Sequence, residues 1–384
     1  MHQKSILIIG HEASLSGAPK SLLYFAKWLK TNKQYTIYFI LQRGGELLDE
    51  YEKIGSVFIW NRNYEDKKLL ERLLNRLYDY EQKRKEKFLF GIKNEIDTIY
   101  CNTCTNGEII ESVKNIISKP LITRIPELEY VIRLFKTLGK VKNTFEQSDA
   151  IIAVAEAVKT NLIANHQVPA SKIHVCYGAI PPPKPISQNK SSLKKSLGIS
   201  EHDFVIGGCG SLIWRKGYDL FIQTAKLAKD LHPTANFKFL WVGGKENSNA
   251  MLEAQRELEL LELVDRVIFQ PSIPNVEDYY QLMDVFFMTS REDPFPLVNL
   301  EAASFGLPII CFDKSGGSTE FVNEEIGFVA PYEDLEFVVD KISLLNENSS
   351  LLQNLSIGAK EKSKQFNMEK SANEIFGVIQ KIIK

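Results

Sequence analysis

The chain has 384 residues, of which 44% are hydrophobic and 25% are charged. This length exceeds what one ordinary core fills, so it predicts two domains, and the composition is that of a folded globular protein. The formal net charge of −1 gives no overall attraction for nucleic acid, so we expect no nucleic-acid partner.

The first half alternates short apolar runs with helical patterns, as in a doubly wound α/β domain. Its first apolar run is too short for a signal peptide, and no later run reaches the roughly 20 apolar residues that cross a bilayer. We therefore expect a cytoplasmic location. The predicted strands are 5–10, 36–41, 57–60, 98–101, 121–124 and 150–154, and the clearest helices are 20–30 and 66–93.

The predicted helix 66–93 is rich in lysine and arginine and carries leucines at helical spacing. A basic amphipathic helix of this kind predicts one of two roles. It rests peripherally on anionic lipid at the inner face of the membrane, or it packs its apolar face on its own domain. Acidic residues dilute its charge, and the sequence leaves both interpretations open.

Cys101 and Cys104 form a C-x-x-C pair at the end of a predicted strand. No second pair and no histidine at zinc-ligand spacing accompanies them. Five cysteines without a dense pattern fit a reducing compartment. We predict two small buried residues here, in preference to a redox or metal site.

Four prolines within residues 178–185 end the first array and favour an extended connector. We predict an N-terminal domain 1–178, a linker 179–193, a C-terminal domain 194–365, and a helix 366–384 that packs back toward the first domain. Two such arrays predict Rossmann-like domains facing each other across a cleft, with ligands at the carboxyl ends of the strands. The second array has strands at 204–208, 238–242, 267–269, 285–288 and 308–312, and helices at 217–231, 249–261, 276–283 and 297–305.

A glycine-rich turn follows the strand 204–208 and contains Gly210, Ser211, Arg215 and Lys216. Such a turn lets backbone N–H groups approach an anion, and two cations just before a helix can neutralise phosphate. Taken alone, the turn barely differs from a solvated basic loop.

Two further motifs follow the strands 285–288 and 308–312. Asp293 and Glu301 are acids eight positions apart, and Glu301 has apolar neighbours on its helix. A carboxylate in such company is costly unless it meets a partner such as a ribose diol, although an ordinary exposed glutamate is the alternative. Gly316 and Gly317, with Glu320 behind them, can offer backbone donors to a phosphate or sugar, and a plain glycine turn is equally consistent.

Together the three motifs resemble the retaining glycosyltransferases of family 4, the group 1 family with the GT-B fold. The resemblance covers essentially the whole chain and is strongest over residues 204–331. It implies an enzyme that transfers a sugar from a nucleoside diphosphate sugar to a glycan or lipid-linked acceptor in surface polysaccharide synthesis. UDP is the family's commonest carrier and GDP the next. The resemblance implies transfer with retention of the anomeric configuration. No D-x-D element with supporting ligands stands out, so we expect transfer without a metal or other cofactor.

The resemblance also assigns roles to single residues. It places Lys216 and Arg215 on the donor diphosphate, Asp293 near the transferred sugar, and Glu301 on the ribose hydroxyls. Lys216, Arg215 and Asp293 are the expected catalytic residues. The other donor-side matches are Gly17, Gly210, Ser211, Phe295, Pro296, Leu297, Gly316, Gly317 and Glu320.

Three positions depart from the family pattern. Ser211 stands where arginine is usual, Asp293 replaces the commoner glutamate, and Pro126 stands where many relatives have a sugar-binding histidine. Ser211 and Pro126 keep open a non-catalytic nucleotide-sugar-binding protein of the same fold. A dehydrogenase is disfavoured, because Ile213 occupies the place of the third glycine of its G-x-G-x-x-G. The residues expected on the acceptor or sugar side are His11, Arg124 and Glu127.

Overall fold

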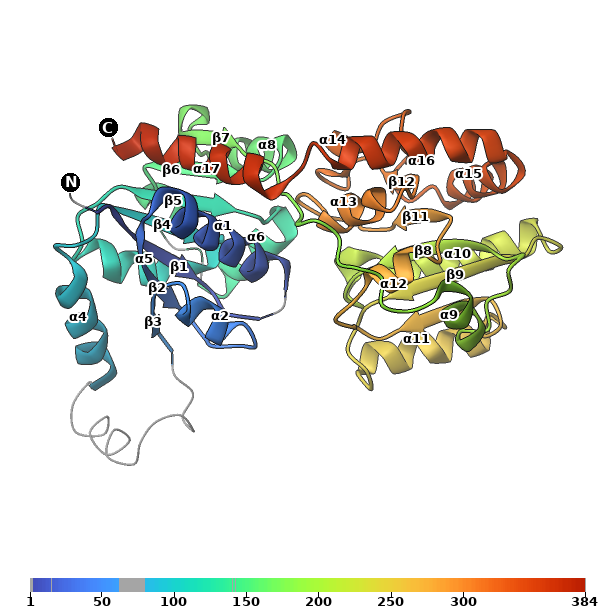
Figure 1. Cartoon of the computed structure of the whole chain (residues 1–384), viewed down its shortest axis with the longest axis horizontal. Coiled ribbons are helices and arrows are strands. Elements are labelled where there is room, and N and C mark those ends of the chain that lie inside the picture. Colours follow the sequence, from blue (N-terminus) through green and yellow to red (C-terminus); the bar gives the residue numbers. More distant parts are fainter. Residues whose placement is uncertain (1–2, 15, 62–79, 140, 142, 384) are drawn as a thin grey trace. The chain divides into compact units, whose positions relative to one another are not determined.

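The computed structural model describes residues 3–14, 16–61, 80–139, 141 and 143–383. The chain divides into two compact units, each with its own sheet (Figure 1). Unit 1 comprises Met1–Gly178 and Met368–Lys384, and unit 2 comprises Ala179–Asn367. Of the predicted basic helix 66–93, residues 66–79 lie outside the described ranges, and the remainder belongs to helix α4, Tyr80–Ile92.

Unit 1 contains an all-parallel sheet, whose strand order in the described chain is β3-β2-β1-β4-β5-β6-β7. The strands at residues 5–10, 98–102, 121–125 and 150–153 are wholly buried because helices flank the sheet, which explains their apolar runs. The strands are β1 Ser5–Gly10, β2 Thr36–Leu41, β3 Ser56–Ile59, β4 Thr98–Asn102, β5 Leu121–Ile125, β6 Ala150–Ala153 and β7 Ile173–Val175. The helices besides α4 are α1 Gly17–Lys33, α2 Leu48–Glu52, η1 Cys104–Asn106, α5 Gly107–Lys114, α6 Glu129–Thr137, α7 Thr144–Gln147, α8 Glu156–His166, η2 Ala170–Lys172 and α17 Met368–Ile383.

The C-terminal helix α17 packs on α1 within unit 1 (Figure 1). The Phe376 ring lies 5.9 Å from the Trp28 ring and 6.0 Å from the Tyr35 ring, centroid to centroid. At its start, the Ser371 hydroxyl donates to the Tyr177 carbonyl oxygen at 3.0 Å. The core of unit 1 is therefore built from two segments separated by all of unit 2.

Unit 2 repeats the arrangement with the parallel strand order β10-β9-β8-β11-β12-β13. Apolar side chains from one face of this sheet pack with those of α10, α11 and α15 and form a core cluster of the unit. The strands are β8 Phe204–Cys209, β9 Phe237–Val242, β10 Val267–Gln270, β11 Val285–Met288, β12 Ile309–Phe312 and β13 Gly327–Ala330. The helices are α9 Lys190–Ser196, η3 Trp214–Lys216, α10 Tyr218–Leu231, α11 Asn249–Leu260, α12 Glu277–Tyr280, α13 Leu297–Ser304, α14 Ser318–Phe321, α15 Leu335–Glu347 and α16 Ser349–Ser363.

Several boundaries differ from the sequence prediction. Residues 190–193, assigned to the linker, begin α9, because the Asn189 side chain accepts the Ser192 N–H at 3.1 Å and caps that helix. The predicted helix 276–283 is shorter, since α12 ends at Tyr280. Strands β7 and β13 were not predicted, because three or four residues carry too little pattern.

All five cysteines are described and are free thiols, and Cys101 and Cys104 are fully buried, as predicted. None of the helices in the described ranges has the length and apolar composition needed to span a bilayer.

Candidate donor-binding site

The candidate site lies at the carboxyl ends of β8 and β11 in unit 2. These neighbouring strands mark the point where the strand order of the sheet reverses. Loops at such a point diverge to opposite faces and leave room for a ligand. The glycine-rich turn after Cys209 and the loop after Met288 meet here, since the Arg291 N–H donates to the Arg215 carbonyl oxygen at 2.9 Å.

Two cations share one buried carboxylate at this point. The Lys216 Nζ forms an ion pair and hydrogen bond with Asp293 Oδ2, and the Arg215 Nη1 lies 3.6 Å from the same oxygen. The Asp293 side chain is 8% exposed and that of Lys216 is 14% exposed. The three predicted catalytic residues are therefore brought together, and two positive charges face one negative charge.

The backbone that presents Lys216 depends on Gly217. This residue has a φ of 68°, and a Cβ atom there would lie 2.2 Å from the Thr289 carbonyl oxygen. The Thr289 hydroxyl in turn donates to the Lys216 carbonyl oxygen at 2.7 Å. Only glycine combines a left-handed conformation with this close approach, so the K-G pair of the sequence motif has a steric reason.

The glycine turn after β12 is held against Asp293. The Asp293 N–H donates to the Ser315 carbonyl oxygen at 2.7 Å, and the Gly317 N–H donates to the Asp293 and Pro294 carbonyl oxygens, each at 3.1 Å. The sequence predicts that the Gly317 N–H donates a hydrogen bond to a phosphate or sugar. In the structure this N–H already donates to backbone carbonyl oxygens of the protein. Gly316 forms an isolated parallel β-bridge with Asp293. The glycine turn is therefore attached to the residue whose carboxylate pairs with Lys216 and Arg215.

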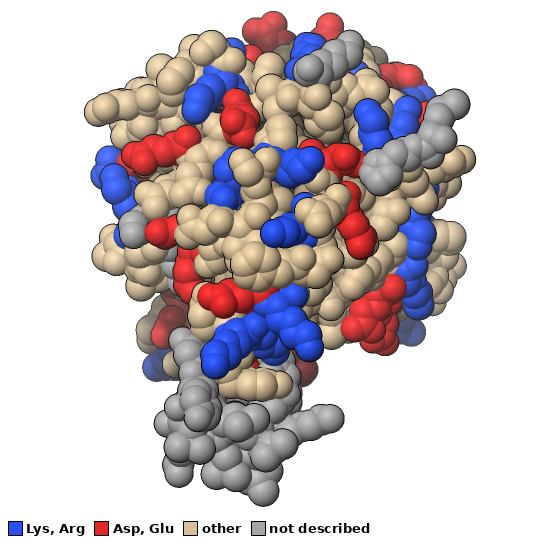
Figure 2. Space-filling model, turned by 90° about the vertical axis from the view of Figure 1, so that its left-hand side faces the viewer, with Lys and Arg blue, Asp and Glu red and all other residues tan. Residues whose placement is uncertain are grey.

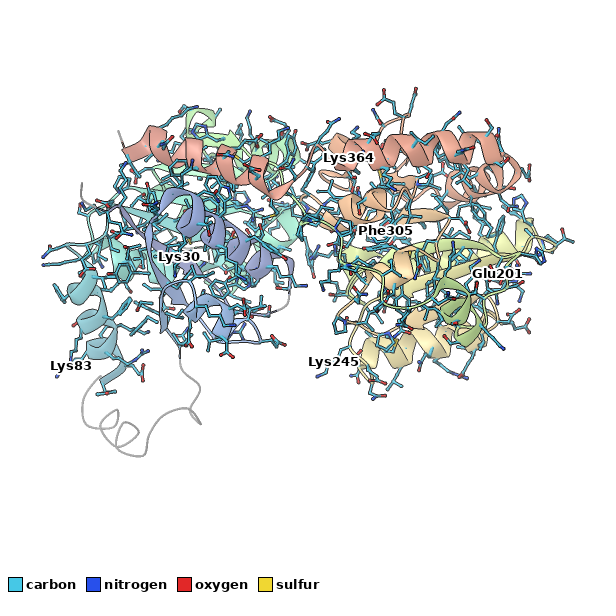
Figure 3. The ribbon with its side chains drawn as sticks, in the orientation of Figure 1. Lys30, Lys83, Glu201, Lys245, Phe305 and Lys364 are labelled. Atoms are coloured by element: carbon cyan, nitrogen blue, oxygen red, sulfur yellow. The ribbon has the colours of Figure 1, made fainter. Side chains whose placement is uncertain are left out.

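Glu301 lies on α13 and has a partner that the sequence did not indicate. The Tyr280 hydroxyl donates to Glu301 Oε2 at 3.0 Å. Both residues line a small cavity of about 40 Å³, together with Val276 and Phe305. Phe305, labelled in Figure 3, follows the last residue of α13. Glu301, which the sequence predicts to bind the ribose, therefore accepts a hydrogen bond from a buried phenol.

The other predicted donor-side residues have mixed surroundings. The Phe295 ring is buried and lies 5.6 Å from the Phe366 ring, so its side chain serves packing. Pro296 precedes α13, whose first residue is Leu297. The remaining predicted residues are Gly210 and Ser211, which follow β8, and Glu320, which lies on α14.

A hollow that sequence reasoning overlooked lies at the carboxyl ends of β8, β9 and β10. Its lining includes Ser211, Lys245, Glu246 and Ser272. Figure 3 labels Lys245 and Glu201 at opposite ends of unit 2, and the hollow lies at the Lys245 end. The Gly243-Gly244 pair that ends β9 was the available signal, since paired glycines after a strand often mark such an edge.

Arg291 is a second residue that the motifs did not single out. Its guanidinium donates to both carboxylate oxygens of Asp219 at 2.8 and 2.7 Å, and its Nε donates to Glu333 at 2.7 Å. It also donates to the Trp214 carbonyl oxygen at 3.0 Å. These bonds, led by that to Asp219, raise the pKa of the Arg291 guanidinium. The network ties the turn that carries Arg215 to α10 and to the loop after β13.

The acceptor-side residues predicted from the sequence belong to unit 1. Arg124 is buried, and its Nη1 donates to Asn102 Oδ1 at 3.3 Å. Glu127 is also buried and accepts the Cys104 N–H at 3.2 Å. Burial raises the pKa of Glu127 to about 7, although the Cys104 N–H and the Arg124 charge oppose this. The structure thus gives Arg124 and Glu127 a buried polar setting at the ends of β4 and β5.

His11 and Gly17 are the two remaining N-terminal residues that the sequence predicts for the site. His11 follows β1, and burial lowers the pKa of its imidazole, while the Glu12 carboxylate opposes that shift. Gly17 is the first residue of α1, and a Cβ atom added there would meet nothing within 4 Å. In this state no steric requirement for glycine exists at position 17.

The described part of the predicted basic helix is α4. Some of its residues pack on unit 1, and others form an exposed basic surface that is available for lipid contact. Arg84 donates to the Ile59 carbonyl oxygen at 2.8 Å and stacks on Phe58, so it packs on its own unit. Lys83 and Lys87 are exposed, and Figure 2 shows lysine and arginine side chains gathered beside the grey residues, where α4 begins. Packing within unit 1 therefore explains Arg84, whereas Lys83 and Lys87 form part of an exposed basic surface.

No group of three His, Cys, Asp or Glu side chains that could hold a metal ion occurs within the described ranges.

Comparison with known proteins agrees with this geometry. Residues 189–362 match the family model of the glycosyl transferases group 1. An uncharacterized glycosyltransferase of Haemophilus influenzae is 27% identical over 248 residues, which cover 64% of this chain and 65% of that protein. The lipopolysaccharide core biosynthesis mannosyltransferase LpsB of Rhizobium meliloti is 26% identical, over 51% of this chain and 57% of LpsB. The chain thus matches between about half and two thirds of the length of these relatives.

Among solved structures, HepE of Anabaena in complex with UDP superposes with a TM-score of 0.79 at 20% identity. The superposition covers 98% of this chain and all of HepE. A likeness at this identity shows the fold alone, here two units that each contain a parallel sheet. The chain therefore has the GT-B fold, and its residues 189–362 match the family model of the glycosyl transferases group 1.

Proposed function

We propose that this protein is a glycosyltransferase that moves a sugar from a nucleoside diphosphate sugar, UDP first and GDP next, to a glycan or lipid-linked acceptor. The observation that carries the proposal is the cluster of Lys216, Arg215 and Asp293 at the reversal point of the unit-2 sheet. Two cations against one carboxylate leave a net positive charge, which suits a donor diphosphate.

Each residue has a chemical task in the proposed reaction. Lys216 and Arg215 offset the charge that grows on the diphosphate as its bond to the sugar C1 breaks. The acceptor oxygen bonds to C1 on the same face, and its proton passes to the departing phosphate oxygen, so the configuration is retained. Asp293 lies beside the sugar and Glu301 accepts hydrogen bonds from the ribose. No metal ion or cofactor is part of the proposal.

The known relatives support the choice of donor and setting. HepE structures contain UDP or UDP-glucose, and LpsB is named for lipopolysaccharide core synthesis. We extend these to the present chain as a proposal, with surface polysaccharide synthesis as the setting. The polar groups of unit 1 that would hold the acceptor are Arg124, Glu127 and His11.

Calorimetric titration tests the donor assignment. UDP, GDP, ADP and CMP are titrated into the parent protein in EDTA, and into Lys216→Ala and Glu301→Ala. Lys195→Ala is the matched control, because this lysine is exposed on α9 of the same unit. We expect one diphosphate to bind the parent and the control, and to bind each site variant at least ~10-fold more weakly. Absence of binding, or unchanged binding in both variants, contradicts the proposal.

Turnover of the matching nucleotide sugar then separates an enzyme from a non-catalytic binding protein. Release of the free diphosphate in the presence of an acceptor extract, lost in Lys216→Ala, is the expected result. Binding without release would favour the non-catalytic alternative that Ser211 and Pro126 keep open.

We also propose that the basic surface of α4 makes peripheral contact with anionic lipid at the cytoplasmic face of the membrane. Lys83 and Lys87 are exposed, and the Phe90 side chain, 55% exposed, can enter the interface. Sedimentation with phosphatidylglycerol vesicles tests the contact against phosphatidylcholine vesicles. We expect binding to the anionic vesicles alone, weakened in Lys83→Glu/Lys87→Glu, and equal binding to both would refute it.

A further inference from the structure

Tyr280 is a fully buried tyrosine that lies between β11 and the end of α13 in unit 2. It ends α12, and its ring packs between Phe286 of β11 and Phe305, with ring centroids 6.1 and 5.7 Å away. Packing alone would be served equally well by phenylalanine. The hydroxyl therefore needs its own account, because a buried polar group is costly unless it forms a useful hydrogen bond.

The hydroxyl group reaches the carboxylate of α13. It donates to Glu301 Oε2 at 3.0 Å, and the Cys209 thiol is close enough to influence its pKa. Cys209 ends β8 and begins the glycine-rich turn that leads to Lys216. The phenol that bonds to Glu301 therefore lies near the strand that leads into the proposed diphosphate-binding turn.

The direction of the hydrogen bond is fixed by the chemistry of the phenol. Burial, first of all, together with the nearby Cys209 and Glu301 groups, raises the pKa of Tyr280 well above its ordinary value. The hydroxyl therefore keeps its proton and always donates. A carboxylate that is pinned at one oxygen keeps its plane, and a diol needs an acceptor in a defined plane to form two hydrogen bonds.

We propose that Tyr280 is a positioning residue of the donor site, which orients the Glu301 carboxylate toward the ribose hydroxyls. The inference rests on the proposed function, because the ribose is that of the bound donor. Tyr280 itself does not contact the reacting atoms.

The first test compares ligands with and without the ribose hydroxyls. UDP and 2′,3′-dideoxy-UDP are titrated into the parent, Tyr280→Phe, Glu301→Gln and the double variant. Tyr279→Phe is the matched control, since Tyr279 is the adjacent buried tyrosine on α12. We expect Tyr280→Phe to bind UDP on the order of 10-fold more weakly than the parent, with unchanged affinity for the dideoxy analogue. In the Glu301→Gln background the same change should have little effect.

If Tyr280→Phe lowers the affinity for UDP and for the dideoxy analogue equally, the tyrosine has a packing role and the proposal is overturned. The proposal is also overturned if the losses of UDP affinity from Tyr280→Phe and Glu301→Gln add up in the double variant. A second measurement separates this inference from the donor assignment. The carboxylate stretching band of Glu301, identified by its loss in Glu301→Gln, should shift in Tyr280→Phe and stay in place in Tyr279→Phe. If the parent binds no nucleotide, the proposed function fails, and an unmoved band then overturns the positioning role as well.

Discussion

Replacing Gly217 by alanine tests whether the turn that presents Lys216 is built as the structure indicates. Gly198 provides a matched control, because its φ of 67° equals that of Gly217 within a degree and a Cβ atom there meets nothing within 4 Å. Both substitutions force alanine into the left-handed region, at a cost of about 1 kcal/mol. Only Gly217→Ala also drives a Cβ to 2.2 Å from the Thr289 carbonyl oxygen, and the necessary backbone shift adds about 2 kcal/mol.

Thermal unfolding followed by circular dichroism measures the difference. For a unit of this size we expect Gly198→Ala to lower the melting temperature by about 3 °C and Gly217→Ala by about 9 °C. UDP affinity should fall in Gly217→Ala alone, because the Thr289 hydrogen bond to the Lys216 carbonyl must break or shift. Equal melting temperatures and equal UDP affinities for the two variants would refute the steric argument.

Three further outcomes are expected. Arg291→Lys should lower the free energy of unfolding by about 1 kcal/mol in urea titrations, since lysine cannot reproduce the two bonds to Asp219 and the bond to Glu333; unchanged stability would contradict this. Burial raises the pKa of Glu127 from 4.5 to about 7. The free energy of unfolding should therefore fall by up to about 3 kcal/mol as pH rises from about 4.5 to about 7. Glu127→Gln should remove this pH dependence in urea titrations at pH 5 and 8, and a pH dependence that persists in the variant would contradict the assignment. The native protein should react slowly with a disulfide reagent at pH 8, because burial raises the pKa of the Cys209 thiol to about 12, and a fast-reacting thiol would be inconsistent with this.

Much of the fold could be predicted from local patterns. Parallel strands buried on both faces give short apolar runs, and glycine-rich segments at their ends mark the turns toward the ligand edge. The runs that became β1, β2, β8 and β11 were located within a residue or so. Short strands such as β7 were overlooked, because three residues do not distinguish a strand from a loop.

The candidate site was only partly predictable. Motif spacing brought out Lys216, Asp293 and Glu301, since each follows a strand of one sheet. It could not indicate that Tyr280 bonds to Glu301, because the two residues are far apart in sequence and meet only through tertiary packing. Likewise, a glycine pattern does not show that the Gly317 N–H is already engaged by backbone carbonyls.

The helix α17 has a consequence for how the polypeptide matures. Its residues Ile375, Phe376 and Ile379 belong to the same apolar cluster as Leu22 and other side chains of α1 and the unit-1 sheet. During synthesis this cluster stays uncovered until the ribosome has made all of unit 2, which can close its own core first. The segment translated earliest therefore completes its core last.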